Sequence, residues 1–501
     1  MKNFRILLLH ELQSQMKSFT FAVMIPVALL VSLLVTNLQV TSYKDRTQVY
    51  LEQQKQSNER LDEIYVYSQF VVDVYMPPSA LSVFAKGLDE SIGNKITVSV
   101  IDPLELSVTS QRSNAFIKIF NNIDISGIVK ILSIFMVLMA ACPVAMDRER
   151  QTGKLTLANS VGQLEYYLSK YAALMVVACI MTTLIFITPV VWMTVDTQID
   201  LSLSAVGSIL LMMMFSILYL SVFVLVSLSI SAISPKVSIA TISSLMVWAM
   251  LVFVYPFTVN SMIDRLVKIS SDSAIKEEIE QIDSEFFKEL MQYYNENGQK
   301  FSNCMSWNFR NSNGIIVQLC VTSKACYESF KTMNDFSLPK VQHKNDRVYA
   351  LKESQKKKLL HKRKLYERFA FFVPDNIYQN VCEQIAGTDY DFRERQFMDA
   401  ARNYRNVLMD YIRTKNGFGY AFFTTIPEAE MRDAYEDYSP EDRDKYCNSG
   451  NSDKLFTPET PRFSFFHRTN TSATWMVVLV SLNLVLGGLS ISICNKFLTF
   501  K

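Results

Sequence analysis

Six apolar segments constrain this chain more than any other feature of its sequence. Each holds about 20 or more largely apolar residues, the length that an α-helix needs to cross the hydrocarbon core of a bilayer. Backbone groups in hydrocarbon must be hydrogen-bonded within the segment itself, so each segment is predicted to be a transmembrane helix. The predicted spans are residues 19–38, 128–146, 171–195, 205–230, 237–259 and 473–497. The sequence therefore predicts an α-helical integral membrane protein with six spans.

Two long polar inserts interrupt the series of spans. The first insert is residues 39–127; a charged, Gln-rich helix is predicted over 44–63 and strands over 96–108, where β-branched residues alternate. The second insert is residues 260–472 and is predicted to be a large, mainly helical domain with minor β structure. An apolar stripe at steps of three and four residues predicts a helix that continues the fifth span outward, and a second strong helix is predicted over 391–414. The stripe consists of Ile275, Ile279, Ile282, Phe286, Leu290 and Tyr294.

The N-terminal segment, residues 1–18, is amphipathic. Phe4, Leu8, Leu12 and Met16 recur at every fourth position, which places them on one side of a helix. We expect an interfacial helix lying on the cytoplasmic leaflet; an ordinary polar N-terminus is the alternative. The first span is longer than the apolar core of a signal peptide, and no small-x-small cleavage site follows it, so a retained signal anchor is expected.

Charge in the short segments predicts the orientation. Six spans place both termini on one side of the membrane. Basic residues gather on that side, whereas the one short link on the other side carries only Asp196 and Asp200. By the positive-inside rule, both termini are expected in the cytoplasm of a bacterium and both inserts outside its cytoplasmic (inner) membrane. The basic run 356–364 is far from any span along the chain; a solvated helix face is predicted there, with binding of an anionic substrate or lipid headgroup as the alternative.

Composition and motifs exclude several functions. The net charge of +2 gives no basic surplus for nucleic acid, so no nucleic-acid partner is expected. The four histidines are scattered and the cysteine spacings do not resemble a zinc site, so no metal site is expected. Five cysteines lie in the second insert and could form up to two disulfides in an oxidising compartment, with one thiol left over. They are Cys304, Cys320, Cys326, Cys382 and Cys447.

The chain lacks the motifs of a nucleotide-binding protein, a zinc protease and a serine hydrolase. It has no G-x-x-x-x-G-K-[ST] loop for nucleotide phosphates, no H-E-x-x-H pair and no G-x-S-x-G elbow, so no catalytic residue and no bound cofactor are expected. Charged residues are nearly absent from the centres of the spans, where a proton- or ion-coupled carrier needs them. A transporter of this sequence is therefore expected to use an external energy source.

The polar segment between the second and third spans, residues 147–170, is a charged hairpin that must lie in water at one membrane face. It resembles the cytoplasmic loop of ABC-2 type permeases, the membrane subunits of one class of ATP-binding-cassette exporter. Those loops carry an acidic-basic cluster, a glycine followed closely by leucine, and a short helix ending in lysine; the threonine usual after the glycine is Lys154 here. The six spans and the amphipathic first helix also fit that family. The matching residues include Asp147, Arg148, Glu149, Arg150, Gly153, Lys154, Leu155, Glu165 and Lys170.

The resemblance implies that a separate ATPase subunit binds ATP and Mg and contacts the charged hairpin. Paired charges such as Glu149 and Arg150 set register and partner choice at an interface. A solvated loop that merely obeys the positive-inside rule is the alternative.

A second resemblance lies in the second insert. Several short segments look like a sub-family of these permeases that has large extracytoplasmic inserts after the first and fifth spans. The segments are Pro374-Asp375-Asn376, Ala386-Gly387-Thr388-Asp389, Arg393, Phe397 and Tyr404-Arg405. We expect a structural role for Gly387, Thr388 and Asp389, because glycine permits positive φ and Thr or Asp can cap the helix that follows. Contact with the substrate is the alternative.

Six spans are too few to enclose a pathway in this class, so a second permease chain, identical or related, is an expected partner beside the membrane lipids. Gly487 and Gly488 in the last span would allow close approach of helices, or else mark loose packing against lipid. The leading hypothesis is an exporter of an amphipathic cargo: a peptide, lipid, glycolipid or drug-like molecule. The rivals are a membrane-anchored binding or assembly protein of the cell envelope, and an anchored enzyme.

Overall fold

The structure is a computed structural model of the chain. It describes residues 2–62, 71–87, 94–99, 104–107, 123–158, 161–195, 202–268, 270–301, 306–310, 316–321, 324–369, 373–389, 392, 396–416 and 465–497. The described part is predominantly helical, with little sheet.

Within the described part of the chain, six helices are long and apolar enough to cross a membrane. They coincide with the six predicted spans, so the chain is a multi-pass membrane protein. They are α2 (Phe19–Asp62), α4 with α5 (Ile125–Ala141 and Pro143–Glu149), α7 (Gln163–Val195), α8 (Leu203–Ile233), α9 with η3 and α10 (Val237–Ala249, Met250–Val254 and Tyr255–Leu266), and α17 (Phe465–Phe497).

The spans divide into central and peripheral helices. In the most apolar part of α4–α5, 67% of the residues are buried within the chain, against 11% in α9–α10. Helix α8 is also largely buried, whereas α17 and α2 are mostly open. Helices α4, α7 and α8 therefore form the centre of the bundle, and α9–α10 presents most of its apolar surface outward.

Prolines shape two of the spans. Pro189 in α7 removes the backbone donor for the carbonyl of Ile185, and the Ser32 hydroxyl of α2 donates to that carbonyl at 3.3 Å. In the fifth span, the π-helical turn η3 directly precedes Pro256, near the start of α10. The helix passes Pro256 and continues beyond the predicted span to Leu266, because Pro256 occupies the first turn of α10, where it is tolerated.

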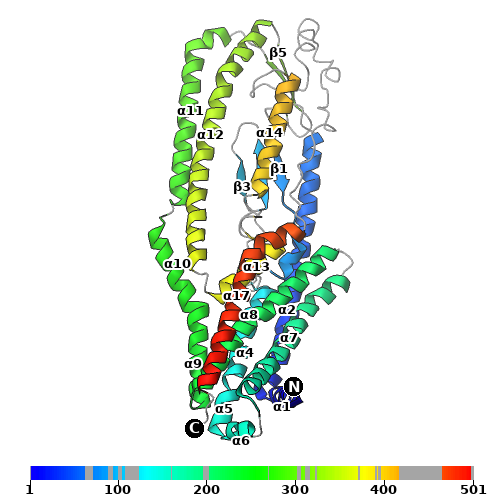
Figure 1. Ribbon diagram of the computed structural model, residues 1–501. Helices are drawn as coiled ribbons and strands as arrows, with labels where there is room; N and C mark the ends of the chain where they lie inside the picture. The colour runs from blue at the N-terminus through cyan, green and yellow to red at the C-terminus, as the bar shows by residue number, and fades with distance from the viewer. Residues whose placement is uncertain are drawn as a thin grey trace.

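Figure 1 shows two ends of the bundle. Helices α1 (Lys2–Met16), α5 and α6 (Thr152–Ala158) lie at one, which we call the hairpin end, together with the C-terminal end of α17. The inserts lie at the other, which we call the insert end. The predicted helix over 44–63 is the outer part of α2, which runs as one helix of 44 residues into the insert end.

A small sheet forms in the first insert. Strands β1 (Val71–Tyr75), β2 (Lys95–Ser99) and β3 (Glu105–Ser107) are antiparallel in the order β1-β2-β3, which confirms the strands predicted over 96–108. Val72 pairs with Val98 and Val74 with Ile96, and all four are buried. Strand β1 was not predicted, although its buried Val72 and Val74 alternate with Asp73, which accepts a hydrogen bond from Thr97 and pairs with Lys95 across the sheet.

The second insert begins with an antiparallel helical hairpin, α11 (Asp272–Phe301) and α12 (Lys324–Phe369), which rises beyond the bundle (Figure 1). Strands β4 (Ser306–Arg310) and β5 (Ile316–Val321) lie in the connection between the two helices and pair with each other. The predicted stripe of α11 faces inward except for Tyr294, which is exposed; Tyr293 instead stacks on Phe336 of α12.

One prediction for this insert is wrong: helix α11 does not continue the fifth span, because the chain takes an extended conformation at Val267. The helix predicted over 391–414 is confirmed as α14, Phe397–Asn416; residues 391 and 393–395 lie outside the described residues. The basic run of α12 is near a span in space although far along the chain: Lys362 forms an ion pair with Asp264 of α10.

Candidate functional site

The charged hairpin contains short helices joined by a tight turn. Helix α5 ends at Glu149, α6 follows from Thr152, and α7 begins at Gln163. Gln151 joins α5 to α6 with φ of 59°, in the left-handed region that non-glycine residues rarely adopt. The Thr152 hydroxyl donates to the Asp147 carboxylate at 2.9 Å and closes the turn.

Lys170 is the centre of an ionic cluster that joins three elements. Its ammonium lies 2.7 Å from the Asp147 carboxylate of α5 and 2.6 Å from the Glu11 carboxylate of α1, and its side chain is only 2% exposed. The Tyr166 hydroxyl donates to Asp147 at 2.5 Å. Removing one partner of such a buried pair leaves an uncompensated charge, so the cluster fixes α1, the hairpin and α7 to one another.

Arg148 and Glu149 fix the hairpin to the next pair of spans. The Arg148 guanidinium donates to the carbonyls of Ala232 and Ser234 at the end of α8, at 2.6 and 2.9 Å. The Glu149 carboxylate accepts from the backbone N–H of Val237 at 3.1 Å, at the start of α9. A cation thus meets the C-terminus of one helix and an anion the N-terminus of the next, as the helix dipoles favour.

The outward face of the hairpin is formed by exposed residues. Arg150 and Lys154 are exposed, and Leu155 of α6 is 69% exposed. Gly153 is buried, and Glu165 is half-buried in α7. The eight predicted residues thus divide into four that bind within the chain (Asp147, Arg148, Glu149 and Lys170), two that face outward (Arg150 and Lys154), and Gly153 and Glu165.

Sequence reasoning missed Glu11 and Tyr166. Glu11 is the one acidic residue in residues 1–18, and Lys170 is the one basic residue between 155 and 235. A search for single charges near the ends of apolar segments would have singled out Glu11 and Lys170 as candidates, but only the fold shows that they pair.

At the insert end, helix α13 (Pro374–Ala386) packs on the spans. Pro374 occupies its first turn, where the missing N–H costs no hydrogen bond. The Tyr378 hydroxyl is 2.8 Å from that of Ser216 in α8, and the Tyr378 ring stacks on Tyr219 at 4.6 Å. Asp375 pairs with Lys130 of α4 at 3.2 Å. The helix was not predicted, although its apolar residues at steps of three and four, between Pro374 and Gly387, are a sufficient signal.

The loop after α13 fastens the two inserts together. Gly387 has φ of 68° and ends the helix, which confirms the expected role of this glycine. The Thr388 hydroxyl donates to the carbonyl of Ala85 at 2.9 Å in the first insert, instead of capping the next helix. Asp389 accepts from the backbone N–H of Phe392 at 3.4 Å, a weak cap of the segment that follows. Arg393 lies outside the described residues.

Gly87 is the counterpart of that loop in the first insert. Its φ is 49°, and a Cβ there would lie 2.7 Å from both the carbonyl oxygen and the hydroxyl of Thr388. The Ser79 hydroxyl donates to the carbonyl of Ala386 at 2.9 Å. Contacts of Ser79 and Gly87 with Ala386 and Thr388 therefore join the two inserts.

Burial affects two titratable groups of α13. It raises the pKa of the Cys382 thiol far above its usual value, and Cys382 is a free cysteine that makes no disulfide. It also raises the pKa of the Glu383 carboxyl, against the opposing effect of the hydrogen bond from Gln379. Cys382 therefore takes no part in the disulfides predicted for the second insert; the side chains of the other four cysteines lie outside what the structure describes.

Two further predicted features can be located. A Cβ added at Gly487 or Gly488 would meet nothing within 4 Å, so no described helix of this chain approaches them closely. Within the described part of the chain, no three His, Cys, Asp or Glu side chains gather as a metal site.

Comparison with known proteins gives one match. A family described as "Domain of unknown function (DUF3526)" matches residues 334–443, which include most of α12 and all of α13 and α14. No curated protein and no solved structure matches the chain. The chain is thus a multi-pass helical membrane protein whose second insert is similar to DUF3526 over these residues.

Proposed function

We propose that this chain is the membrane-spanning permease subunit of a bacterial ABC-2 type exporter, driven by a separate ATPase subunit. ATP and Mg are bound by that partner, and an amphipathic cargo such as a peptide, lipid, glycolipid or drug-like molecule is moved. In this proposal both termini and the charged hairpin are cytoplasmic, and both inserts are outside.

The observation that carries the proposal is the way the charged hairpin is held. Lys170 joins it to α1 and α7, and Arg148 and Glu149 join it to the turn between α8 and α9. A force on the exposed face of α6 is therefore passed to several spans at once. A solvated loop needs neither the buried ion pairs of Lys170 nor the hydrogen bonds of Arg148 and Glu149.

The exposed face of the hairpin suits an interface with a motor subunit. Leu155 offers an apolar contact, and Arg150 and Lys154 offer charges that set partner choice. A second permease chain completes the pathway in this proposal, and the open surface of α9 and of Gly487 and Gly488 is available for it.

Co-purification tests the proposal. The full-length chain, extracted with its native partners, is expected to bring down an ATP-binding subunit. The charge reversal Arg150→Glu with Lys154→Glu should reduce the co-purified subunit by about tenfold or more, since like charges across an interface cost several kcal/mol. Glu149→Arg is a poorer test, because Glu149 also binds the backbone of Val237.

The matched control is Lys276→Glu with Lys288→Glu on the exposed surface of α11. It makes the same change of charge at the insert end and should leave the complex intact. Absence of any ATP-binding subunit from the wild-type preparation would refute the exporter; retention of ATPase coupling in the hairpin variant would refute the docking face.

One observation favours the rival function, a membrane-anchored binding or assembly protein of the cell envelope. Helix α11 exposes Phe287, Met291 and Tyr294 at steps of four and three residues, an apolar stripe on the projecting hairpin. In that case scrambling the α6 face would leave function intact, and Phe287→Ser with Met291→Ser would abolish it.

A further inference from the structure

The outer end of the fifth span meets the lower end of α12. Lys362 pairs with Asp264, the Gln355 amide donates to the Ser270 hydroxyl at 3.2 Å, and the Tyr255 hydroxyl donates to the carbonyl of Phe369 at 2.7 Å. These contacts run antiparallel along the two helices. The basic run of α12 is thereby set beside α10.

The length of the fifth span places α10 at the level of lipid headgroups. The helix from Val237 to Leu266 has 30 residues, about 45 Å at 1.5 Å each, which matches a bilayer including its headgroups. The first 20 of these residues cross the hydrocarbon. Arg265, near the end of the helix, then lies among the phosphates on the insert side.

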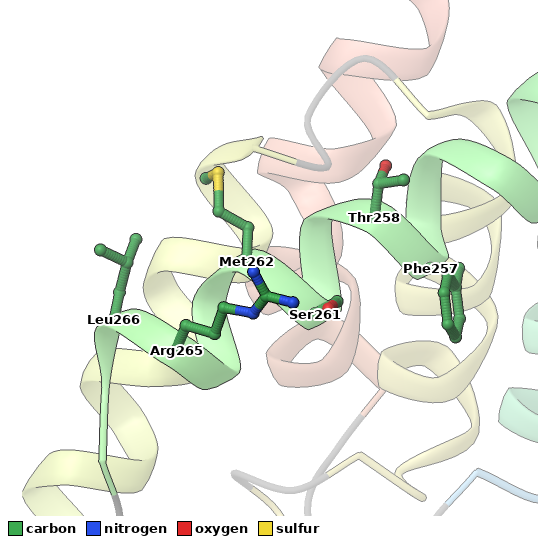
Figure 2. A pocket seen from close by; sticks show the side chains of 6 residues that line it. All are labelled: Phe257, Thr258, Ser261, Met262, Arg265 and Leu266. Carbon is green, nitrogen blue, oxygen red and sulfur yellow. The ribbon is translucent and has the colours of Figure 1, made fainter.

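A hollow opens on the outward face of α10. It has a volume of about 420 Å³ and is lined by Phe257, Thr258, Ser261, Met262, Arg265 and Leu266. Figure 2 shows the Arg265 guanidinium lying back along the helix toward Ser261, between the apolar side chains of Phe257 and Leu266. Phe257 is 75% exposed, so an apolar wall stands open beside a cation and two hydroxyls.

The part of α12 that lies beside α10 is strongly positive. Residues 356–368 contain seven basic residues and one acid, Glu367. Arg265, Lys268, Lys358 and Lys364 are exposed, and none forms an ion pair with a carboxylate of the described residues. Asp264 is paired with Lys362, so it does not neutralise them.

We infer that this surface binds an anionic phospholipid of the insert-side leaflet, with its phosphate at Arg265 and Lys358 and its acyl chain along Phe257, Met262 and Leu266. The apolar wall matches the acyl chain, and the hydroxyls and unneutralised cations at the depth of the headgroups match the phosphate. The inference rests on the chain spanning a membrane and is independent of the proposed exporter function.

Lipid titration of the purified full-length protein tests this inference. Dioleoylphosphatidylglycerol should raise the unfolding temperature in detergent, whereas dioleoylphosphatidylcholine and inorganic phosphate should not. Arg265→Gln with Lys358→Gln should weaken the phosphatidylglycerol effect about thirtyfold in lipid concentration, at about 1 kcal/mol for each cation. Phe257→Ser should weaken it as well.

The matched control is Lys276→Gln with Lys288→Gln on α11, which should respond to lipid as the wild type does. Equal stabilisation by the two lipids, an equal effect of inorganic phosphate, or an unchanged response of the Arg265 variant would each overturn the inference. The Arg265 and Lys358 side chains are exposed, so the unfolding temperature without lipid serves as the check on folding.

Discussion

The hairpin end and the insert end of this protein fasten polar segments to the same bundle by different means. At the hairpin end the contacts are ionic: a buried lysine holds two carboxylates, and Arg148 and Glu149 hold helix termini. At the insert end they depend on shape: the apolar face of α13 lies on the spans, and Gly87 lies against Thr388. Lys130–Asp375 is the ion pair described there between α13 and a span.

The two ends are therefore expected to respond differently to substitutions. Charge-assisted hydrogen bonds are directional, and the loss of one charge disrupts every contact that this charge makes. Such contacts suit a segment that passes on a displacement. Contacts of shape tolerate changes of charge but not of volume, because protein interiors are close-packed. The hairpin end is built to be sensitive to charge, and the insert end to be sensitive to the size of single residues.

Lys170→Met, at the hairpin end, is expected to have the largest effect on stability. Two carboxylates would then be left buried without a cation, at an expected cost of about 3–5 kcal/mol in the free energy of unfolding. Unfolding of the purified protein with sodium dodecyl sulfate measures it. Lys154→Met, on the exposed face of the same hairpin, should change stability by less than about 0.5 kcal/mol. Equal effects of the two substitutions would show that the ionic cluster does not hold the hairpin end.

At the insert end the corresponding change is Gly87→Ala. The new methyl group would meet Thr388 at 2.7 Å on a backbone with positive φ, so a loss of about 1–3 kcal/mol is expected in the same assay. Gly487→Ala is the control, since its methyl group meets nothing within 4 Å and alanine favours the helix. A tolerated Gly87→Ala would contradict the tight contact between the two inserts.

The smallest expected effect is the pH dependence of Glu383. Burial raises the pKa of this carboxyl in the folded protein, so the fold favours its protonated form. Its contribution to stability is present below the ordinary pKa of glutamate, about 4.3, and is lost as pH rises through the raised value. Glu383→Gln should therefore raise the unfolding temperature at pH 7.5 and leave it unchanged near pH 4. A gain that is the same at both pH values would assign the effect to packing.

The sequence by itself determined the six spans, the strands over 96–108 and the turn at Gly387. Each depends on a local property: the length of an apolar segment, the alternation of side chains along a strand, or the φ of one residue. The local sequence did not determine where the helices end. The helix of the fifth span, for example, continues to Leu266, because Pro256 falls where a helix tolerates proline.

Only the tertiary structure decided which distant residues meet. Glu11 and Lys170 are 159 positions apart, and Thr388 and Ala85 are 303 apart. Nothing local to either residue names its partner. The same reason placed the basic run of α12 beside the fifth span, where counting along the chain had separated them. Hydropathy decides that a segment enters the membrane, whereas packing decides what it touches there.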